Sequence, residues 1–344
     1  MPIMIFFRIL VITFLLNLGL ALPAVAEIPL GSPPLQKGMT LGLFSKEANY
    51  SYYEDLKEMQ NYGITHILLV VSWYQQDIYS TELKPMEFDH ADAMTIPDAK
   101  LIEVIQQANS LGLKTSLFPI IRLMQRKSGE WRGVLKPKDI AQWFLSYENF
   151  ILHYANLAKT HGVAMLSVGS ELGSLEKEKD RWIALIQKVR VIFPGKLIYS
   201  ANWDHYQKVT FWDQLDYIGM TAYYELTKIK NPTYTQLINS WRNIRNHLLQ
   251  WKQQYKQPLI FTEIGYLSID GTNIYPWNYF AKEKVDLEEQ ALCYRAFARA
   301  WGSMPQLGGV YFWVWWGNGG AQDKSYTPHN KPAGKVMKEW YGQS

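Results

Sequence analysis

Short apolar runs alternate with longer amphipathic stretches along most of the chain. The clearest run is Ile67-Leu68-Leu69-Val70-Val71, a continuous hydrophobic segment typical of a strand that is buried on both faces. Other runs of similar length recur at fairly regular intervals, and the stretches between them are long enough to form helices. We expect strands at residues 39–44, 64–73, 115–121, 164–169, 197–201, 217–222, 259–262 and 310–315.

The stretches between these runs carry the start and stop signals of helices. One begins at Pro97 and ends at Gly112, the two residue types that helix ends prefer. We expect helices at residues 52–62, 97–112, 136–160, 176–193, 234–255, 287–304 and 333–341, with a short and poorly defined one at 211–214.

Eight strands that alternate with helices predict a parallel sheet, and eight is the number that closes into a barrel. The competing arrangement is an open doubly wound sheet, but no glycine-rich phosphate loop follows the first strand. The expected fold class is therefore α/β, a single (β/α)8 TIM barrel. We expect it to span residues 38–344, after a linker at residues 27–37 that contains Pro, Gly and Ser.

The first 26 residues have the features of an export signal. Arg8 supplies a positive charge, Ile9 to Leu22 form a 14-residue apolar stretch, and Ala24-Val25-Ala26 is a small-residue cleavage site. Fourteen residues fall short of the roughly 20 that a membrane-spanning helix needs, so we favour cleavage over a retained anchor. We expect an exported monomer, periplasmic or extracellular, without a membrane anchor after cleavage.

The composition narrows the class of protein. Of the 344 residues, 48% are hydrophobic and 15% are aromatic, so both a sizeable core and an aromatic-lined sugar cleft are compatible with the chain. The net charge is +4 with well-mixed signs, so we expect no nucleic-acid partner. The single cysteine, Cys293, excludes an intramolecular disulfide. The seven His show no ligand spacing, and we expect neither a metal nor a cofactor.

Two glutamates stand where expected strands end. Glu171 closes the fourth strand, and Glu263 follows the seventh. Each alone is as compatible with a salt bridge or a helix cap as with catalysis. Strands four and seven of an eight-stranded ring lie nearly opposite each other, however, and barrels keep their chemistry at the C-terminal rim. Two carboxyl groups facing each other across such a rim are the working parts of a glycosidase.

Polar and aromatic residues stand at the other strand ends. One carboxyl of a retaining glycosidase must stay protonated while the other stays ionised, and Arg122 and Tyr223 are candidates for holding the ionised state. For stacking on sugar rings, with plain packing as the alternative, the candidates are Trp73, Trp203, Trp315 and Trp316. We expect Trp313 and Trp315 to face the same side, because side chains alternate along a strand.

Three phrases resemble the clan A glycoside hydrolases, and glycoside hydrolase family 113 in particular. They are Val168-Gly169-Ser170-Glu171, Thr262-Glu263-Ile264-Gly265-Tyr266 and Tyr311-Phe312-Trp313-Val314-Trp315. The resemblance covers roughly Gly38 to Tyr341. It implies a barrel enzyme that cuts β-1,4-mannan with retention of anomeric configuration.

By position, the resemblance implies that Glu171 is the acid/base and Glu263 the nucleophile. It also implies that Tyr223 hydrogen-bonds the nucleophile and that Trp313 forms an aromatic floor after the eighth strand.

One position departs from the pattern of the clan. Most members have Asn before the acid/base, where it binds the sugar 2-hydroxyl, and this chain has Ser170. Serine is shorter, so another group such as Asn202 is expected to take over that contact. The departure affects the choice of substrate more than the type of reaction.

The sequence therefore predicts a cofactor-independent retaining glycoside hydrolase that acts on a β-linked polysaccharide or oligosaccharide, with β-1,4-mannan as the first choice. Two alternatives stay open. One is a non-catalytic glycan-binding barrel, and the other is a hydrolase of a different β-glycan or of the cell's own exopolysaccharide.

Overall fold

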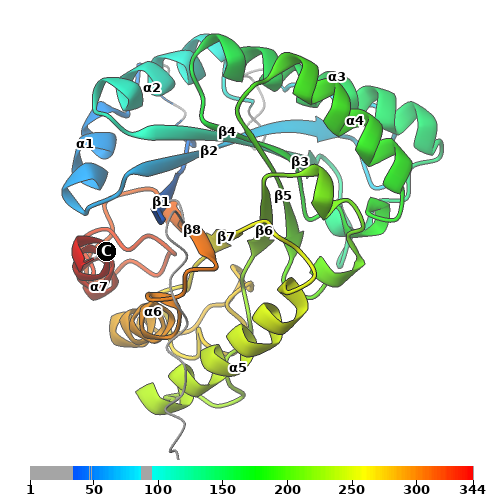
Figure 1. Ribbon diagram of the computed structural model, residues 1–344. Helices are drawn as coiled ribbons and strands as arrows, with labels where there is room; N and C mark the ends of the chain where they lie inside the picture. Colours follow the sequence, from blue (N-terminus) through cyan, green and yellow to red (C-terminus); the bar gives the residue numbers. More distant parts are fainter. Residues whose placement is uncertain (1–33, 46, 48, 87–94, 344) are drawn as a thin grey trace, which may run out of the picture. The chain divides into compact units, whose positions relative to one another are not determined.

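Eight parallel strands close into one barrel, in the order β1 to β8 around the ring (Figure 1). The computed structural model describes residues 34–343 except 46, 48 and 87–94. The expected export signal at residues 1–26 lies outside the described residues. The predicted (β/α)8 fold is confirmed, because each strand pairs in parallel with its neighbours along the chain and β8 returns to β1.

The strands fall where the apolar runs predicted them. They are β1 Gln36–Leu41, β2 His66–Gln75, β3 Lys114–Leu123, β4 Met165–Ser170, β5 Lys196–Asn202, β6 Tyr217–Thr221, β7 Leu259–Ile264 and β8 Leu307–Trp315. Most boundaries differ from expectation by one to three residues, and two of these differences matter here. β1 begins at Gln36, so the last two residues of the expected linker belong to the sheet. β7 runs on to Ile264, so Glu263 lies within the strand rather than after it.

Helices follow most of the strands and pack around the outside of the barrel (Figure 1). They are α1 Tyr53–Asn61, α2 Asp98–Ser110, α3 Ile140–Thr160, α4 Lys179–Ile192, α5 Tyr234–Lys252, α6 Leu287–Trp301 and α7 Pro332–Gln343. Between β5 and β6 the described chain forms only two 3-10 turns, η3 Tyr206–Lys208 and η4 Trp212–Gln214. The short helix expected at residues 211–214 is the second of these turns.

The start of α5 illustrates how local sequence sets a helix boundary. Thr233 accepts a hydrogen bond from the backbone N–H of Gln236, and the Gln236 side chain accepts one from the backbone of Thr233. This reciprocal capping box satisfies two donors that the first turn of a helix otherwise leaves unpaired.

Alternation along the strands divides the core into two layers. Odd residues of β2 such as Ile67 and Leu69 pack against the helices, and even residues such as Leu68 and Val70 fill the barrel interior. The interior cluster consists of Leu68, Val70, Phe118, Ile120, Met165, Ile198, Ile260 and Tyr311. These apolar side chains plug the lower barrel, so polar groups that must meet a ligand are confined to its C-terminal mouth.

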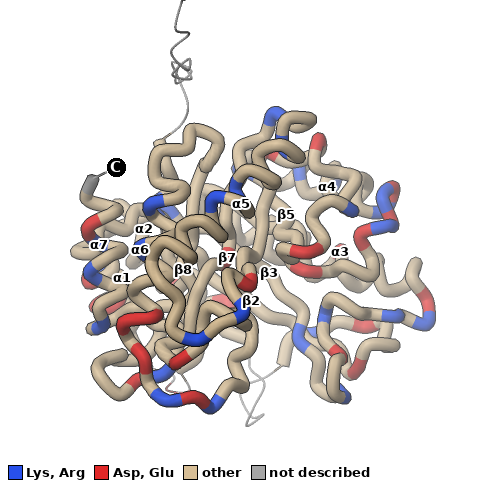
Figure 2. The backbone as a smooth tube through the Cα atoms, turned by 90° about the horizontal axis from the view of Figure 1, so that it is seen from below, with Lys and Arg blue, Asp and Glu red and all other residues tan. Residues whose placement is uncertain are grey.

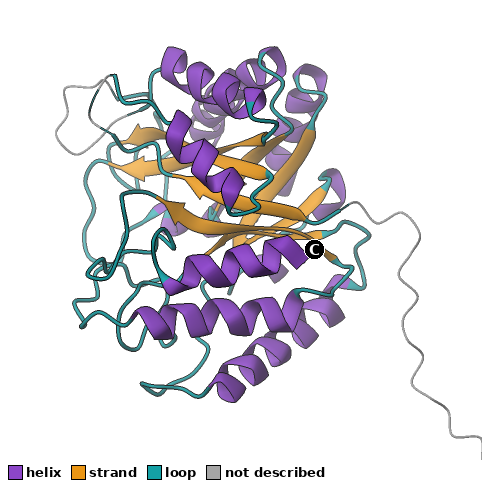
Figure 3. Ribbon diagram, turned by 90° about the vertical axis from the view of Figure 1, so that its left-hand side faces the viewer, coloured by secondary structure: helices purple, strands orange, loops and turns teal. Residues whose placement is uncertain are grey.

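The C-terminal ends of the strands all face one side, where the arrowheads point in Figure 3. Lys and Arg are interspersed with Asp and Glu over the helices and loops around the barrel (Figure 2). In the part of the chain that the structure describes, no helix combines the length and apolarity needed to cross a membrane.

Candidate active site

Glu171 lies immediately after β4, in a backbone conformation that few side chains adopt. Its φ is 55°, in the left-handed region, and its N–H donates to the carbonyl of Ser200 on β5 at 2.8 Å. This turn takes the residue out of the strand while keeping it tied to the neighbouring one. The residue is only 7% exposed, so its carboxylate meets protein on most sides. Strained φ values of this kind are concentrated at functional sites.

Both carboxylate oxygens of Glu171 accept hydrogen bonds. Arg132, in the 3-10 turn η1 (Arg132–Val134) after β3, donates from its guanidinium to Oε2 at 2.6 Å. Thr221, the last residue of β6, donates from Oγ1 to Oε1 at 2.5 Å. An ion pair and a hydroxyl donor therefore hold Glu171 at both of its oxygens.

Glu263 is held differently, inside β7. The residue is 5% exposed, and the hydroxyl of Tyr223, two residues beyond β6, donates to its Oε2 at 2.9 Å. The register of β7 against both neighbours shifts near this residue, as in a β-bulge. Such a shift re-aims side chains at a barrel rim.

The electrostatics join these groups into one site. Burial raises the pKa of Glu263 to about 8, and the negative charge of Glu171 adds to the rise, while Arg132 and the Tyr223 hydroxyl oppose it. Burial works against the charge of Arg132, but the carboxylates of Glu171 and Glu263 outweigh it and leave the pKa of Arg132 raised. Arg132 therefore interacts with both carboxyl groups.

A second buried carboxyl supports the turn that carries Glu171. The Tyr199 hydroxyl accepts from the N–H of Leu172 at 3.1 Å and donates to Oε1 of Glu176 at 2.8 Å. Burial raises the pKa of Glu176 to about 7, although the Tyr199 hydrogen bond opposes the rise. The residue after Glu171 is thus fixed through Tyr199.

Ser170 and Asn202 lie beside Glu171 but differ in whether their side chains have hydrogen-bond partners. The Ser170 hydroxyl is buried and meets no hydrogen-bond partner among the described residues. The Asn202 amide, expected to replace the usual Asn contact, donates to Asp204 at 2.9 Å and accepts from Thr221 at 3.3 Å. Both its amide nitrogen and its oxygen thus already have protein partners.

Three predicted aromatic residues take different positions. Trp313 is half-buried and contacts both the barrel interior and a cluster at the mouth that includes Tyr223. Trp203 is half-buried against the same mouth cluster, with its ring 5.3 Å from that of Tyr224. Trp73 packs instead on α3, 5.1 Å from the ring of Phe150, so the structure does not bring it to the mouth.

The prediction that Trp315 faces the same side as Trp313 is wrong. Trp315 is fully buried on the helical side, where its ring stacks on His329 at 4.5 Å. The reason is a register shift between β1 and β8: Met39 pairs with Phe312, but Leu41 pairs with Trp315. The extra residue reverses the alternation. The peptide bond between Trp313 and Val314 in this stretch is cis.

Arg122 was predicted as a candidate for stabilising the ionised carboxylate, but the structure does not place it beside either glutamate. It lies near the end of β3 and is exposed, and within the described residues it has no hydrogen bond to Glu171 or Glu263. Arg132 makes that contact from ten residues further on. Sequence reasoning missed Arg132 because it lies deep in a loop, and it missed Thr221, which strand alternation with Tyr223 would have indicated.

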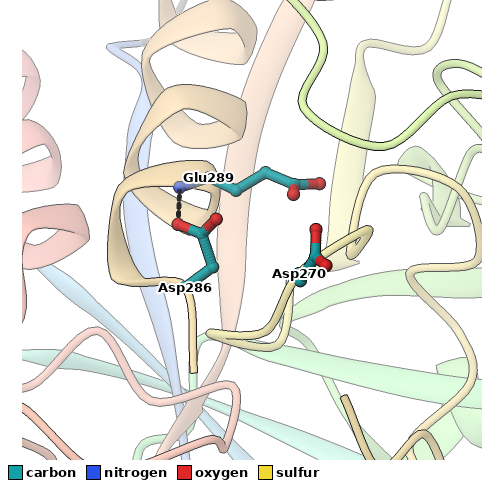
Figure 4. Close-up of side chains that lie close together, drawn as sticks. All are labelled: Asp270, Asp286 and Glu289. Carbon is teal, nitrogen blue, oxygen red and sulfur yellow. Dashed lines mark hydrogen bonds between the residues drawn. The ribbon is translucent and has the colours of Figure 1, made fainter. Parts of the chain in front are cut away.

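Three carboxylates gather at the base of the loop that follows β7. Asp270, Asp286 and Glu289 have oxygens within 4.8 Å of one another (Figure 4). Glu289 accepts from the backbone N–H groups of Gly271 and Asn273, and Asp286 accepts from the N–H of Glu289 at the start of α6.

Lys230 lies 3.5 Å from Asp270 and offsets part of this negative charge. The hydrogen bonds give these carboxylates a structural role, fastening the loop to α6.

Comparison with known proteins places the chain in a family. The family model for Glycoside Hydrolase Family 113 matches residues 39–331. A structure described as a complex of GH113 β-1,4-mannanase has 27% identity and a TM-score of 0.79, and covers 90% of this chain and 99% of its own. The GH113 β-mannanase of Alicyclobacillus acidocaldarius, in complex with ManMIm, has 26% identity, a TM-score of 0.79, and coverage of 92% and 99%.

More distant matches share only the fold. A β-glucuronidase of Faecalibacterium prausnitzii has 12% identity and a TM-score of 0.61, and covers 91% of this chain and 49% of its own. No curated protein matches the chain. The family match spans most of the sequence and includes both glutamates, so the chain belongs to Glycoside Hydrolase Family 113, a clan A family of glycoside hydrolases.

Proposed function

We propose that this glycoside hydrolase cleaves β-1,4-mannan or a related β-linked glycan with retention, using Glu171 as acid/base and Glu263 as nucleophile. The observation that carries the proposal is that two buried glutamates, one directly after β4 and one in β7, interact with the same cation, Arg132. The order of the roles follows the clan A pattern of the flanking phrases. The substrate is suggested by two structurally similar proteins described as β-mannanases.

The proposed mechanism needs Glu263 ionised and Glu171 protonated at the start. Burial and the negative charge of Glu171 raise the pKa of Glu263, which opposes its ionisation, while Arg132 and the Tyr223 hydroxyl lower that pKa. These two donors therefore favour the ionised nucleophile that attack requires.

The reaction then proceeds in two displacements. Glu171 gives its proton to the leaving oxygen as the Glu263 carboxylate bonds to the anomeric carbon. Glu171, now ionised, takes a proton from a water molecule as that water attacks the anomeric carbon and displaces Glu263. Glu171 is then protonated and Glu263 ionised again, as at the start. Tyr223, bonded to Oε2, positions the attacking carboxylate.

The test combines substrate profiling with chemical rescue. Wild type is expected to cleave β-mannan in a panel of β-glycans and to release products of retained configuration. With an activated aryl β-mannoside and added azide, Glu263→Gly should form the α-glycosyl azide, since azide then replaces the nucleophile. Glu171→Ala should form the β-glycosyl azide, since azide then intercepts the glycosyl-enzyme. Reversed azide products would exchange the two roles, and failure of wild type on every glycan would end the proposal.

We also propose that the protein is exported as a monomer after cleavage behind Ala26, on the basis of the sequence features of residues 1–26. N-terminal sequencing of the protein secreted by its host should begin at Glu27. A retained N-terminus in the membrane fraction would contradict cleavage, and a dimer in sedimentation velocity would contradict the monomer.

A further inference from the structure

Exposed aromatic side chains are concentrated in one short segment of the loop after β7. Residues 275–280, here called the aromatic strap, include Tyr275 at 53%, Trp277 at 46%, Tyr279 at 56% and Phe280 at 64% exposure. They are four of the seven large aromatic residues exposed among the described part of the chain. An apolar surface of this density, left in water, marks a binding site more often than chance exposure.

The strap is anchored around the mouth of the barrel. The Trp277 indole donates to Glu225, in the loop after β6, at 3.2 Å. The Tyr326 hydroxyl, from the loop after β8, donates to the carbonyl of Pro276 at 2.5 Å. These bonds fix the segment between the two loops that flank its own strand.

A third anchor lies on the opposite side of the ring. Arg126, three residues beyond β3, donates to the Tyr279 hydroxyl at 3.1 Å, and its guanidinium lies 5.6 Å from the centre of the Phe280 ring. β3 and β7 are four positions apart in the eight-stranded ring, so the strap reaches from one side of the mouth to the other.

The strap also lies close to the two glutamates. Tyr326, which holds Pro276, has its ring 6.1 Å from that of Tyr223, the hydrogen-bond donor to Glu263. Tyr279 is among the charges that act on Arg132, the cation bound to Glu171. A chain seated at the glutamates would therefore extend over the strap.

We propose that the aromatic strap binds sugar units of a neutral β-linked hexose chain on either side of the cleavage point. It offers two stacking positions, the Tyr275–Trp277 pair held at Glu225 and the Tyr279–Phe280 pair held at Arg126. The proposal rests on the function argued above and adds the residues that recognise the polymer.

The surroundings favour a glycan over a protein partner. Polar groups surround the rings, as a sugar with one apolar face and many hydroxyls requires: Arg126, Glu225 and Asn278. The base of the loop is fastened by the bridge between Ile269 and Val285 and by the carboxylates of Figure 4. A fixed aromatic surface loses little entropy on binding, which suits a weakly interacting sugar chain.

The test separates binding from turnover. In the full chain carrying Glu263→Gln, mannohexaose affinity is measured by calorimetry, alone and with Trp277→Ala or Phe280→Ala. Each strap substitution should weaken binding about 10-fold. Tyr53→Ala, which removes an exposed aromatic of α1 at 37% exposure, is the matched control and should leave affinity unchanged. Trp277→Phe keeps a ring and should lose less than Trp277→Ala.

The wild-type background supplies the second measurement. Strap variants should lose kcat/KM on mannan but keep it on an aryl mannoside of one sugar unit, which is too short to reach the strap. Equal mannohexaose affinity in all variants, with mannan still cleaved by wild type, would overturn the strap and leave the function standing.

If the strap substitutions weaken mannohexaose binding but the wild type does not cleave mannan, the proposed function would be overturned and sugar binding by the strap would stand. A concentration-dependent dimer that Trp277→Ala abolishes, with sugar affinity unchanged, would mean that the strap binds protein and would also overturn the proposal.

Discussion

The ends of β4 and β7 present the same residue type to the same mouth, yet they treat it in opposite ways. Glu171 is ion-paired and hydrogen-bonded at both oxygens, by Arg132 and Thr221. Glu263 is buried and accepts from the Tyr223 hydroxyl, and burial raises its pKa to about 8. The difference teaches that donors from neighbouring strands and loops, rather than the glutamates themselves, set the environment of each carboxylate. A substitution at each donor can therefore remove part of the contrast.

Arg132→Gln should have the largest effect, because Arg132 contacts one glutamate and acts on the other. Its loss removes the cation that lowers the pKa of Glu263, so that pKa should rise above about 8. The proposed mechanism needs ionised Glu263, so the loss in kcat should be greatest at acidic pH and shrink as pH rises. A loss of about 100-fold at pH 6 is expected for a broken buried ion pair. The measurement is a pH profile of kcat on an aryl mannoside.

The matched control for Arg132→Gln is Arg181→Gln, which removes an exposed arginine of α4 paired with Glu178 at 3.7 Å. It should change the profile by less than about 2-fold. A uniform loss at all pH values in Arg132→Gln would contradict the electrostatic role and leave only a positioning one.

Tyr223→Phe should have the next largest effect, and it acts on the β7 side alone. It removes the hydrogen bond to Glu263 Oε2, which also lowers the pKa of that carboxyl. A charge-assisted hydrogen bond contributes about 1.5–3 kcal/mol, so kcat should fall roughly 10- to 100-fold. Tyr224→Phe is the control, since its hydroxyl donates to the sulfur of Met220 and, in the described structure, contacts neither glutamate. An effect confined to KM would assign Tyr223 to substrate binding instead.

Tyr223 and Arg132 also differ in whether the sequence alone could identify them as site residues. Strand positions followed from continuous apolar runs, because a strand buried on both faces has that signature, and Tyr223 and the two glutamates were found as strand ends. Arg132 was not, because a side chain in a loop is placed by tertiary contacts that have no period in sequence. The predicted side of Trp315 was wrong because β8 contains one extra residue relative to β1, which reverses the alternation of side chains before Trp315.

Thr221→Val tests the remaining donor of the β4 side. It removes the 2.5 Å hydrogen bond to Glu171 Oε1 while keeping the shape of the side chain and the contact of Arg132 with Oε2. One of two anchors is lost, so a fall in kcat of about 3- to 10-fold is expected. Thr115→Val is the control, because the buried Thr115 hydroxyl has no partner in the described protein. A loss as large as that of Arg132→Gln would show that the hydroxyl, and not the ion pair, holds Glu171.

Glu176→Gln should have the smallest effect on catalysis and a measurable one on stability. Glu176 lies behind Glu171 and reaches its turn only through Tyr199. Because its folded pKa is raised to about 7 from 4.5, the folded protein keeps a proton there that the unfolded chain releases. The resulting stability is present below about pH 4.5 and is lost as pH rises through about 7.

A neutral glutamine should therefore leave Tm unchanged near pH 5 and raise it by a few degrees, about 3 °C, at pH 8. The measurement is calorimetric Tm at both pH values, with the exposed Glu339→Gln of α7 as control. A kcat within about 2-fold of wild type is expected, since the Tyr199 hydroxyl keeps its bond to Leu172. A Tm gain equal at both pH values would mean that packing, not the proton, decides the difference. A large loss of kcat with unchanged Tm would mean instead that the support behind the β4 turn is as critical as the donors in front of it.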